Sequence, residues 1–240
     1  MADNLITFKE PKSPISESYR MVRTNLHYLN IDNKNKAIVV TSSNPGEGKT
    51  TTMANLAITM SQAGQKVLLV ECDLRKPRVH KTFDLDNNMG LVNVIVENKS
   101  VRDVIHKIDS IPNLNIITAG PIPPDPAELL QSTMMKELID KFKNEYDVVL
   151  FDAPPVCSVT DAAILSNLVD GVILVVASGE TNIESAKLAK KLLQKVHANI
   201  LGVVLSKADI SKTGGYYYHY YEYGEDATTK KHKKRKHKRK

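Results

Sequence analysis

The sequence lacks the features that mark membrane-spanning and disulfide-rich proteins. It contains no tryptophan and two cysteines, Cys72 and Cys157, without metal-ligand spacing, so we expect both to be reduced, small buried residues. No apolar run approaches the roughly 18 residues needed to span a bilayer. The first residues, MADNLITFKEPKSP, lack the basic and apolar pattern of a signal peptide. A cytoplasmic location is therefore the expectation.

The net charge of +6 comes from one end of the chain. Residues 230–240, KKHKKRKHKRK, carry nine lysines and arginines, and the rest of the chain carries 24 basic against 27 acidic side chains. Such a run is typical of a solvated tail or of a binder of anionic surfaces. We rank an anionic membrane surface, or no partner, ahead of nucleic acid, because no folded nucleic-acid motif accompanies the run.

Aliphatic segments alternate with helical patterns through most of the chain. Strands are predicted at 37–43, 66–73, 113–120, 146–155, 170–178 and 198–209, and helices at 15–30, 132–145, 182–197 and, as an amphipathic helix, from Lys49 to Gly64. This alternation predicts one α/β domain, residues 1–209, with a mostly parallel sheet covered by helices on both faces. The apolar pattern then stops, so residues 210–240 are expected to be a flexible, disordered tail.

The stretch SNPGEGKT, residues 43–50, nearly fits the phosphate-loop pattern G-x-x-x-x-G-K-[ST], with Ser43 at the first glycine. Because it follows a strand and opens a helix, backbone N–H groups and the helix N-terminus would meet at one phosphate. Lys49 would reach the β- and γ-phosphates of ATP, and the Thr50 hydroxyl would bind Mg²⁺. The residues expected to bind the nucleotide are Asn44, Pro45, Gly46, Glu47, Gly48, Lys49, Thr50 and Thr51.

Two further motifs place carboxylates at strand ends. Asp152, in VVLFDAPP, is placed like a Walker B carboxylate that holds Mg²⁺ directly or through water. Glu71 and Asp73, in VLLVECDLRKP, are two residues apart and so face the same side of a strand. Either could take a proton from an incoming hydroxyl or help to hold the metal. The alternative is that these strand-end acids are solvated or cap a helix. A separate segment, LSKAD (residues 205–209), fits a strand-to-tail turn better than a loop that recognises a nucleotide base.

Six of the nine tyrosines lie within eight positions. This tyrosine cluster consists of Tyr216, Tyr217, Tyr218, Tyr220, Tyr221 and Tyr223 in the stretch GGYYYHYYEYGED. The stretch has too few aliphatic residues to pack by itself, and its two glycines loosen the junction with the domain. Fully extended, residues 210–223 would span roughly 45 Å. The cluster is either a substrate segment or an aromatic tail without chemistry.

Together these motifs resemble the bacterial tyrosine kinases of capsule and exopolysaccharide synthesis, the BY-kinase family. The resemblance covers nearly the whole chain up to Tyr223 and rests on SNPGEGKT, LLVECDLR and VVLFDAPP in this order. AGPIPPDPAELL (119–130), the TDA at 160–162 and the tyrosine cluster add to it. It implies a P-loop ATPase fold and autophosphorylation of the cluster with Mg-ATP, in trans, between neighbouring subunits of a ring.

The resemblance also implies partners. Gram-positive members are separate cytoplasmic chains, activated at the inner face of the cell membrane by a transmembrane adaptor, a polysaccharide co-polymerase. A cognate phosphotyrosine phosphatase is a further implied partner. The family's oligomerisation motif, E-x-x-R-x-x-R, matches Glu17, Arg20 and Arg23, which would otherwise be interpreted as a surface ion-pair ladder.

Three features of the sequence depart from the patterns of the BY-kinases or of the related partition ATPases, and two other functions remain open. Glu71 stands where the family usually has Asp, which leaves the base open between Glu71 and Asp73 while Asp73 also takes a metal role. Asn44 stands where partition ATPases carry an extra lysine, and the basic run lies outside the family pattern. A partition-type or division-site ATPase is the first alternative, against which Asn44 and the tyrosine cluster speak. A non-catalytic scaffold is the second, against which the set Lys49, Thr50 and Asp152 speaks.

Overall fold

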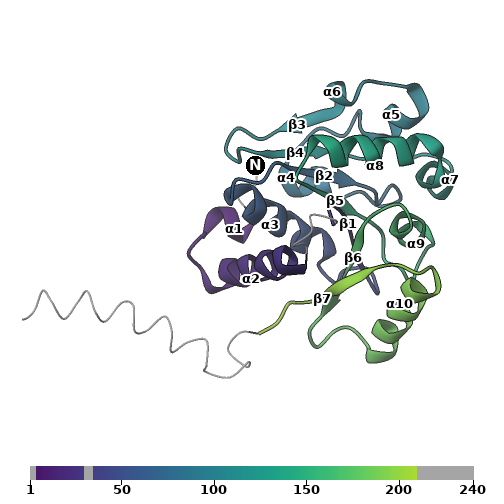
Figure 1. Cartoon of the computed structure of the whole chain (residues 1–240). Coiled ribbons are helices and arrows are strands. Elements are labelled where there is room, and N and C mark those ends of the chain that lie inside the picture. The colour runs from purple at the N-terminus through teal and green to yellow at the C-terminus, as the bar shows by residue number, and fades with distance from the viewer. Residues whose placement is uncertain (1–3, 30–34, 210–240) are drawn as a thin grey trace, which may run out of the picture. The chain divides into compact units, whose positions relative to one another are not determined.

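The structure is a computed structural model that describes residues 4–29 and 35–209 (Figure 1). The chain divides into two units, Met1–Lys207 and Ala208–Lys240. All the helices and strands discussed below belong to the first unit. The tyrosine cluster and the basic run, predicted to be a flexible tail, lie outside the described residues.

Within the described residues, seven strands form one sheet in the order β3-β4-β2-β5-β1-β6-β7. The strands are β1 (Ala37–Ser42), β2 (Val67–Glu71), β3 (Ile105–Lys107), β4 (Leu114–Ile117), β5 (Val148–Asp152), β6 (Gly171–Ala177) and β7 (Ile200–Ser206). All neighbours are parallel except β3, which runs antiparallel to β4. The predicted mostly parallel α/β fold is confirmed. The sequence analysis missed β3, because this three-residue edge strand has no buried residue.

The long helices lie close to where the sequence pattern places them. The helices are α1 (Ile6–Lys9), α2 (Pro14–Leu29), α3 (Lys49–Gln62), α4 (Val79–Phe83), α5 (Leu91–Glu97), α6 (Val101–Val104), α7 (Pro126–Gln131), α8 (Thr133–Glu145), α9 (Asp161–Ser166) and α10 (Ile183–Lys195). Of these, α2, α3, α8 and α10 were predicted. The other six have at most seven residues each, which is too short for a helical period to show.

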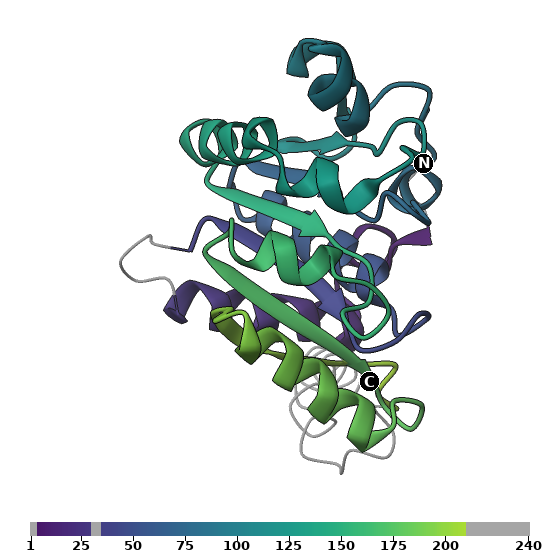
Figure 2. The ribbon, with the colours of Figure 1, turned by 90° about the vertical axis from the view of Figure 1, so that its right-hand side faces the viewer.

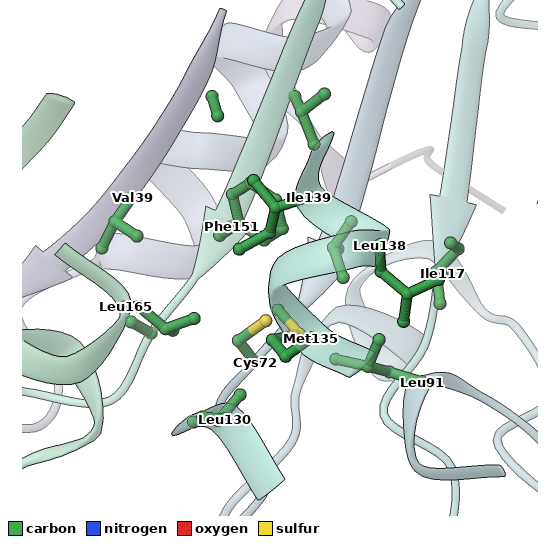
Figure 3. Packing of buried hydrophobic residues seen from close by; sticks show 14 of the residues in the cluster. Val39, Cys72, Leu91, Ile117, Leu130, Met135, Leu138, Ile139, Phe151 and Leu165 are labelled. Carbon is green, nitrogen blue, oxygen red and sulfur yellow. The ribbon is translucent and has the colours of Figure 1, made fainter. Parts of the chain in front are cut away.

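Each face of the sheet packs against its own set of helices, because successive strand residues point to opposite faces. Val39 and Phe151 lie in the same core as Met135, Leu138 and Ile139 of α8. Figure 3 shows these side chains close together, and Figure 2 looks onto the face that carries α8, α9 and α10. The neighbouring strand residues belong to the opposite core, with α1, α2, α3 and α4: Ile38, Val40, Leu69 and Leu150 are examples.

The helix after the phosphate loop differs from its predicted amphipathic form. Of the 14 residues of α3, 11 are buried, because the sheet covers one side and α1 and α2 cover the other. Its polar residues have internal partners. Asn55 Oδ1 accepts hydrogen bonds from the backbone N–H and the hydroxyl of Thr7 in α1, at 3.0 and 2.8 Å. The prediction was wrong because a short N-terminal helix covers the polar side of α3.

The carboxyl ends of the central strands meet at one edge of the sheet. Val40 of β1 and Glu71 of β2 both stand in register with Asp152 of β5. In a parallel sheet this edge is where ligands bind.

Both cysteines are free thiols; Cys72 is buried, and Cys157, expected to be buried, is partly exposed. Among the described helices, none combines the length and the apolar character needed to cross a bilayer.

Candidate active site

The phosphate loop, residues 43–50, joins β1 to α3. Gly46 and Gly48 have φ angles of +83° and +85°, in the left-handed region that favours glycine. These turns direct the chain from the end of β1 into α3, which begins at Lys49. The first turn of α3 therefore supplies free N–H groups and the positive end of the helix dipole at the loop.

Glu47 braces this loop from inside. Its carboxylate, in a residue only 4% exposed, accepts hydrogen bonds from the Ser43 N–H at 2.8 Å, the Asn44 side chain at 3.2 Å and the Thr181 hydroxyl at 2.8 Å. Ser206 at the end of β7 donates to the Glu47 carbonyl at 2.5 Å. The carboxylate thus holds the loop in shape, and the loop is tied to the β6–α10 connection and to β7.

Lys49 lies between two carboxylates. Its Nζ is 3.1 Å from Asp73 Oδ2 and 3.2 Å from Asp152 Oδ1. The Thr50 hydroxyl donates to Asp152 Oδ2 at 2.6 Å. The structure therefore brings together Lys49, Thr50, Asp73 and Asp152 from α3, the end of β5 and the segment after β2.

Glu71 occupies a different position from Asp73, although both follow the same strand. Glu71 is fully buried, and its Oε2 accepts hydrogen bonds from the backbone N–H groups of Arg78 and Val79 at 2.8 and 2.6 Å. Its Oε1 accepts a longer one, 3.3 Å, from the Asp73 N–H. Glu71 thus organises the loop between β2 and α4. Asp73 lines the cleft beside the phosphate loop, and its Oδ1 accepts from the Lys76 N–H at 3.0 Å.

The buried charges of the site shift one another's pKa values. Burial, together with the charge of Asp152, raises the pKa of Glu71 to about 8. Burial likewise raises the pKa of Asp152, although the Lys49 charge and the Thr50 hydroxyl oppose this. Burial disfavours the charged form of Lys49, but Asp152, Asp73 and Glu71 outweigh it and its pKa is raised. The site thus holds a stable cation beside two buried acids, Glu71 and Asp152, whose pKa values are raised.

An ion pair that the sequence analysis did not anticipate fixes the loop after β2. Arg75 forms two hydrogen bonds to Asp161, of 2.9 and 3.0 Å, in the fork-to-carboxylate geometry of a strong pair. Asp161 is fully buried and opens α9. The motifs LLVECDLR and TDA contain both residues, but nothing in the sequence indicates that they are partners.

The cleft at this edge of the sheet has a volume of about 570 Å³. It is lined by Pro45, Gly46, Gly48, Lys49, Thr50, Thr51, Asp73, Arg75, Pro154 and their neighbours. Among the described residues, no three His, Cys, Asp or Glu side chains are arranged to hold a metal by themselves. Mg²⁺ does not need such a cage, since it binds through one or two carboxylates together with phosphate oxygens and water. The oxygens of Thr50, Asp73 and Asp152 fit that requirement.

The three residues predicted for subunit assembly do not line this cleft. Glu17 and Arg20 form an ion pair of 2.7 Å on α2, while Arg23 donates to the Thr59 carbonyl of α3 at 2.8 Å. The three residues therefore share a helix, but Arg23 already serves a contact within the chain. In the segment LSKAD, Lys207 pairs with Glu180 at 2.5 Å.

Known proteins are similar to this chain in sequence. A family model described as an AAA domain matches residues 35–204. Tyrosine-protein kinase YwqD of Bacillus subtilis (strain 168) is 44% identical over 219 residues, which cover 91% of this chain and 92% of YwqD. The putative tyrosine-protein kinase CapB of Staphylococcus aureus is 40% identical over 222 residues, 92% of this chain and 96% of CapB.

Solved structures show the same fold. The crystal structure of the chimerical protein CapA2B2 superimposes with a TM-score of 0.80 at 42% identity, over 84% of this chain and 88% of that one. The septum site-determining protein MinD from Pyrococcus horikoshii OT3, complexed with Mg-ADP, has a TM-score of 0.61 at 26% identity, over 71% of this chain and 70% of MinD.

Proposed function

The chain belongs to the bacterial tyrosine-protein kinases of capsule and exopolysaccharide synthesis, and we propose that it phosphorylates its own tyrosine cluster, in trans, with Mg-ATP. The phosphoacceptors would be Tyr216, Tyr217, Tyr218, Tyr220, Tyr221 and Tyr223. The observation that carries the proposal is the placement of Lys49 within 3.2 Å of both Asp73 and Asp152 at the head of the phosphate loop. Phosphoryl transfer requires this kind of positioned charge more than covalent help from the protein.

The phosphate loop and α3 would bind the nucleotide. Backbone N–H groups of residues 44–51 and the α3 N-terminus would surround the phosphates, and Lys49 would move from the carboxylates to the β- and γ-phosphates. Thr50 and Asp152 would hold Mg²⁺, with Asp73 close by. When bound, the metal neutralises the charge that develops on the transferred phosphoryl group. The Mg-ADP bound to MinD, a protein of the same fold, supports this assignment.

Asp73 is the better candidate for the residue that orients and deprotonates the incoming tyrosine hydroxyl. Asp73 lines the cleft, and its Oδ2 would lose its present partner once Lys49 turns to the phosphates. Glu71 is buried behind it, with both carboxylate oxygens accepting backbone N–H groups. We therefore assign Asp73 a role as base as well as metal neighbour, and Glu71 the role of positioning the loop that carries Asp73.

The proposal includes assembly and regulation. Subunits would form a ring through the α2 stripe of Glu17, Arg20 and Arg23, and the tail, residues 210–240, would reach the cleft of a neighbouring subunit. A transmembrane polysaccharide co-polymerase would act as adaptor, hold the kinase at the inner face of the cell membrane and help to set polysaccharide chain length. An adaptor of this kind is what the resemblance to the BY-kinase family implies. A phosphotyrosine phosphatase would reverse the modification, and the basic run would add contact with anionic lipid.

Anti-phosphotyrosine blotting with Mg-ATP, with and without the cytoplasmic segment of the adaptor, tests the proposal. Tyrosine labelling supports the kinase. ATP hydrolysis without labelling would favour a partition-type or division-site ATPase, and neither activity would favour a scaffold. Mixing a Lys49→Met chain with an active chain whose six cluster tyrosines are phenylalanine tests transfer in trans. Label on the Lys49→Met chain is the expected result, and its absence in the mixture would contradict transfer in trans.

A further inference from the structure

A second hollow, strongly basic in character, adjoins the active-site cleft. Arg75, Lys76, Arg78 and Lys81 line it from the β2–α4 segment, and Pro121 and Ile122 line it from the segment after β4, around a volume of about 590 Å³. We call it the basic groove. Arg75, Lys76 and Arg78 also line the active-site cleft, so the two hollows share one wall.

Three of the four cations are available to an anion. Arg75 is already paired with Asp161, whereas Lys76, Arg78 and Lys81 are exposed and form no ion pair with another described residue. The backbone of this segment is nevertheless fixed, since the Lys76 N–H donates to Asp73 and the Arg78 N–H to Glu71. The cations therefore stand on a positioned loop, and a dianion would find partners without reorganising the backbone.

Pro121 and Ile122 make an apolar wall of the groove, and their segment is also held in place. Ile122 is 67% exposed, so its side chain can contact a ligand that enters the groove. The Gly120 N–H donates to Asn87 Oδ1 at 2.9 Å, and the Asn87 amide donates back to the Gly120 carbonyl at 3.0 Å. Gly90 packs so closely on this segment that a Cβ there would lie 2.2 Å from the Thr118 carbonyl oxygen. The apolar wall is therefore a fixed part of the groove.

Cations facing an apolar surface suit a ligand that has a phosphate dianion on an aromatic ring. Phosphotyrosine carries about −1.5 to −2 charges at neutral pH on such a ring, and an unmodified tyrosine lacks the charge. The acidic residue Glu222 lies within the tyrosine cluster, and Glu225 and Asp226 follow it; the same cations would attract these carboxylates.

We propose that the basic groove binds a phosphotyrosine of the cluster while another tyrosine of the same segment occupies the active-site cleft. Tyr216 and Tyr223 are separated by roughly 23 Å in an extended chain, which allows one segment to enter two hollows that share a wall. The groove would retain a partly phosphorylated segment, so that further tyrosines are modified before it leaves. This inference rests on the proposed autophosphorylation, because that reaction would supply the ligand.

Peptide binding to the full-length Lys49→Met chain, saturated with Mg-ADP, tests the groove without turnover. The probe is a fluorescent peptide of residues 214–226, either unmodified or phosphorylated at Tyr220, and the readout is fluorescence anisotropy. We expect the phosphorylated peptide to bind at least about tenfold more tightly than the unmodified one, because one additional charge-assisted hydrogen bond contributes about that much to affinity. Adding Lys81→Gln should remove most of this difference. Adding Lys141→Gln, the same charge change at an exposed position on α8, should not.

Any one of three results would contradict phosphotyrosine binding in the basic groove. The first is equal affinity for both peptides, and the second is an equal loss of phosphopeptide affinity in the Lys81→Gln and Lys141→Gln chains. The third is displacement of the phosphopeptide by inorganic phosphate at the concentration of the peptide. In the otherwise wild-type chain, mass spectrometry should show a lower ratio of multiply to singly phosphorylated chains with Lys81→Gln than with Lys141→Gln. A wild-type chain that forms no phosphotyrosine would refute the proposed kinase reaction instead. The peptide measurement would still decide the groove.

Discussion

Lys49 is the residue on which the chemistry of the site depends. In the structure its ammonium group lies between Asp73 and Asp152, while Glu71 contributes a third nearby acid. The same charge would stabilise the γ-phosphate during transfer. One side chain therefore neutralises the acids in the absence of nucleotide and would act on ATP in its presence.

Replacing Lys49 with methionine should abolish phosphotyrosine formation and also weaken the fold. Methionine fills similar space without the charge, so Asp73 and Asp152 would face each other without a cation. Removing one partner of a buried ion pair costs about 3 kcal/mol, which urea unfolding at neutral pH would detect. Blotting after incubation with Mg-ATP and the adaptor segment measures the activity. Persistent labelling would remove this cleft from consideration as the kinase site.

The raised pKa of Glu71 predicts that the stability of the fold changes with pH in a definite direction. Its pKa is raised from 4.5 to about 8 by burial and by Asp152, so the folded protein holds this proton more tightly than the unfolded chain does. A group of this kind lowers stability as pH rises, here from about 4.5 towards about 8. Burial raises the pKa of Asp152 in the same direction.

The variant Glu71→Gln should therefore lose less stability between pH 6 and pH 9 than the wild type, measured by urea unfolding without nucleotide or metal. Glutamine keeps the acceptor oxygen for the Arg78 and Val79 N–H groups but does not ionise. Asp140→Asn, at an exposed position on α8, is the matched control and should behave as the wild type. Parallel pH profiles for the wild type and the Glu71→Gln chain would contradict the charge interpretation.

At the scale of elements, the sequence predicted what depends on local pattern. The parallel strands were visible because Val67–Glu71 and Val148–Asp152 are entirely buried and are apolar up to the acid that ends each strand. The phosphate loop was visible because its glycines stand at fixed offsets before Lys49. The burial of the outer side of α3 was not visible in the sequence, because it depends on a hydrogen bond between Thr7 and Asn55, which are 48 positions apart. Pattern within a segment is local, whereas the partner of a polar face is not.

The tie between the phosphate loop and the β6–α10 connection gives a prediction about two elements. Thr181 donates its hydroxyl to Glu47 at 2.8 Å and accepts from the Ala177 N–H at 2.7 Å. Thr181→Val should cost roughly 1–2 kcal/mol, because a buried carboxylate loses a donor. Since Glu47 shapes the loop, Mg-ADP affinity should also fall, by about threefold to tenfold. Titration calorimetry checks the affinity, and Thr181→Ser, which keeps the hydroxyl, should restore it.

Substitutions in the α2 stripe should distinguish effects on subunit assembly from effects on folding stability. Glu17 and Arg20 make an exposed pair worth under about 1 kcal/mol, whereas Arg23 holds the Thr59 carbonyl of α3. Glu17→Ala should therefore disrupt the proposed ring without a measurable change in stability, while Arg23→Ala should disrupt the ring and cost about 2 kcal/mol. Sedimentation velocity and urea unfolding measure the two effects. A Glu17→Ala chain that assembles as the wild type does would exclude this residue from the subunit contact.

At the scale of the whole molecule, the arrangement of the site could be predicted only in outline. Because strand ends meet at one edge of a parallel sheet, the sequence predicts that Lys49, Asp73 and Asp152 lie together. The bidentate pair of Arg75 and Asp161 spans 86 positions, and nothing in the two local sequences connects them. The basic groove likewise needs the β2–α4 segment and the segment around Gly120 to meet, which is a property of the folded unit.

The opposite charges near the C-terminal end lead to a prediction about the assembled protein. Six phosphotyrosines would add about −9 to −12 charges, and the nine lysines and arginines of residues 230–240 follow them directly. One phosphotyrosine would be held in the basic groove, but full phosphorylation would add more negative charge than the groove's cations can neutralise. Full phosphorylation should therefore weaken tail binding beside the acidic site and loosen a ring held by tails, while the basic run would neutralise part of the added charge. A chain lacking residues 230–240 should therefore dissociate more completely after phosphorylation than the full-length chain, as measured by sedimentation velocity at matched phosphate content. The difference should shrink as salt rises, because screening weakens interactions between exposed charges. Identical sedimentation of the two phosphorylated chains at low salt would show that the basic run has no such effect.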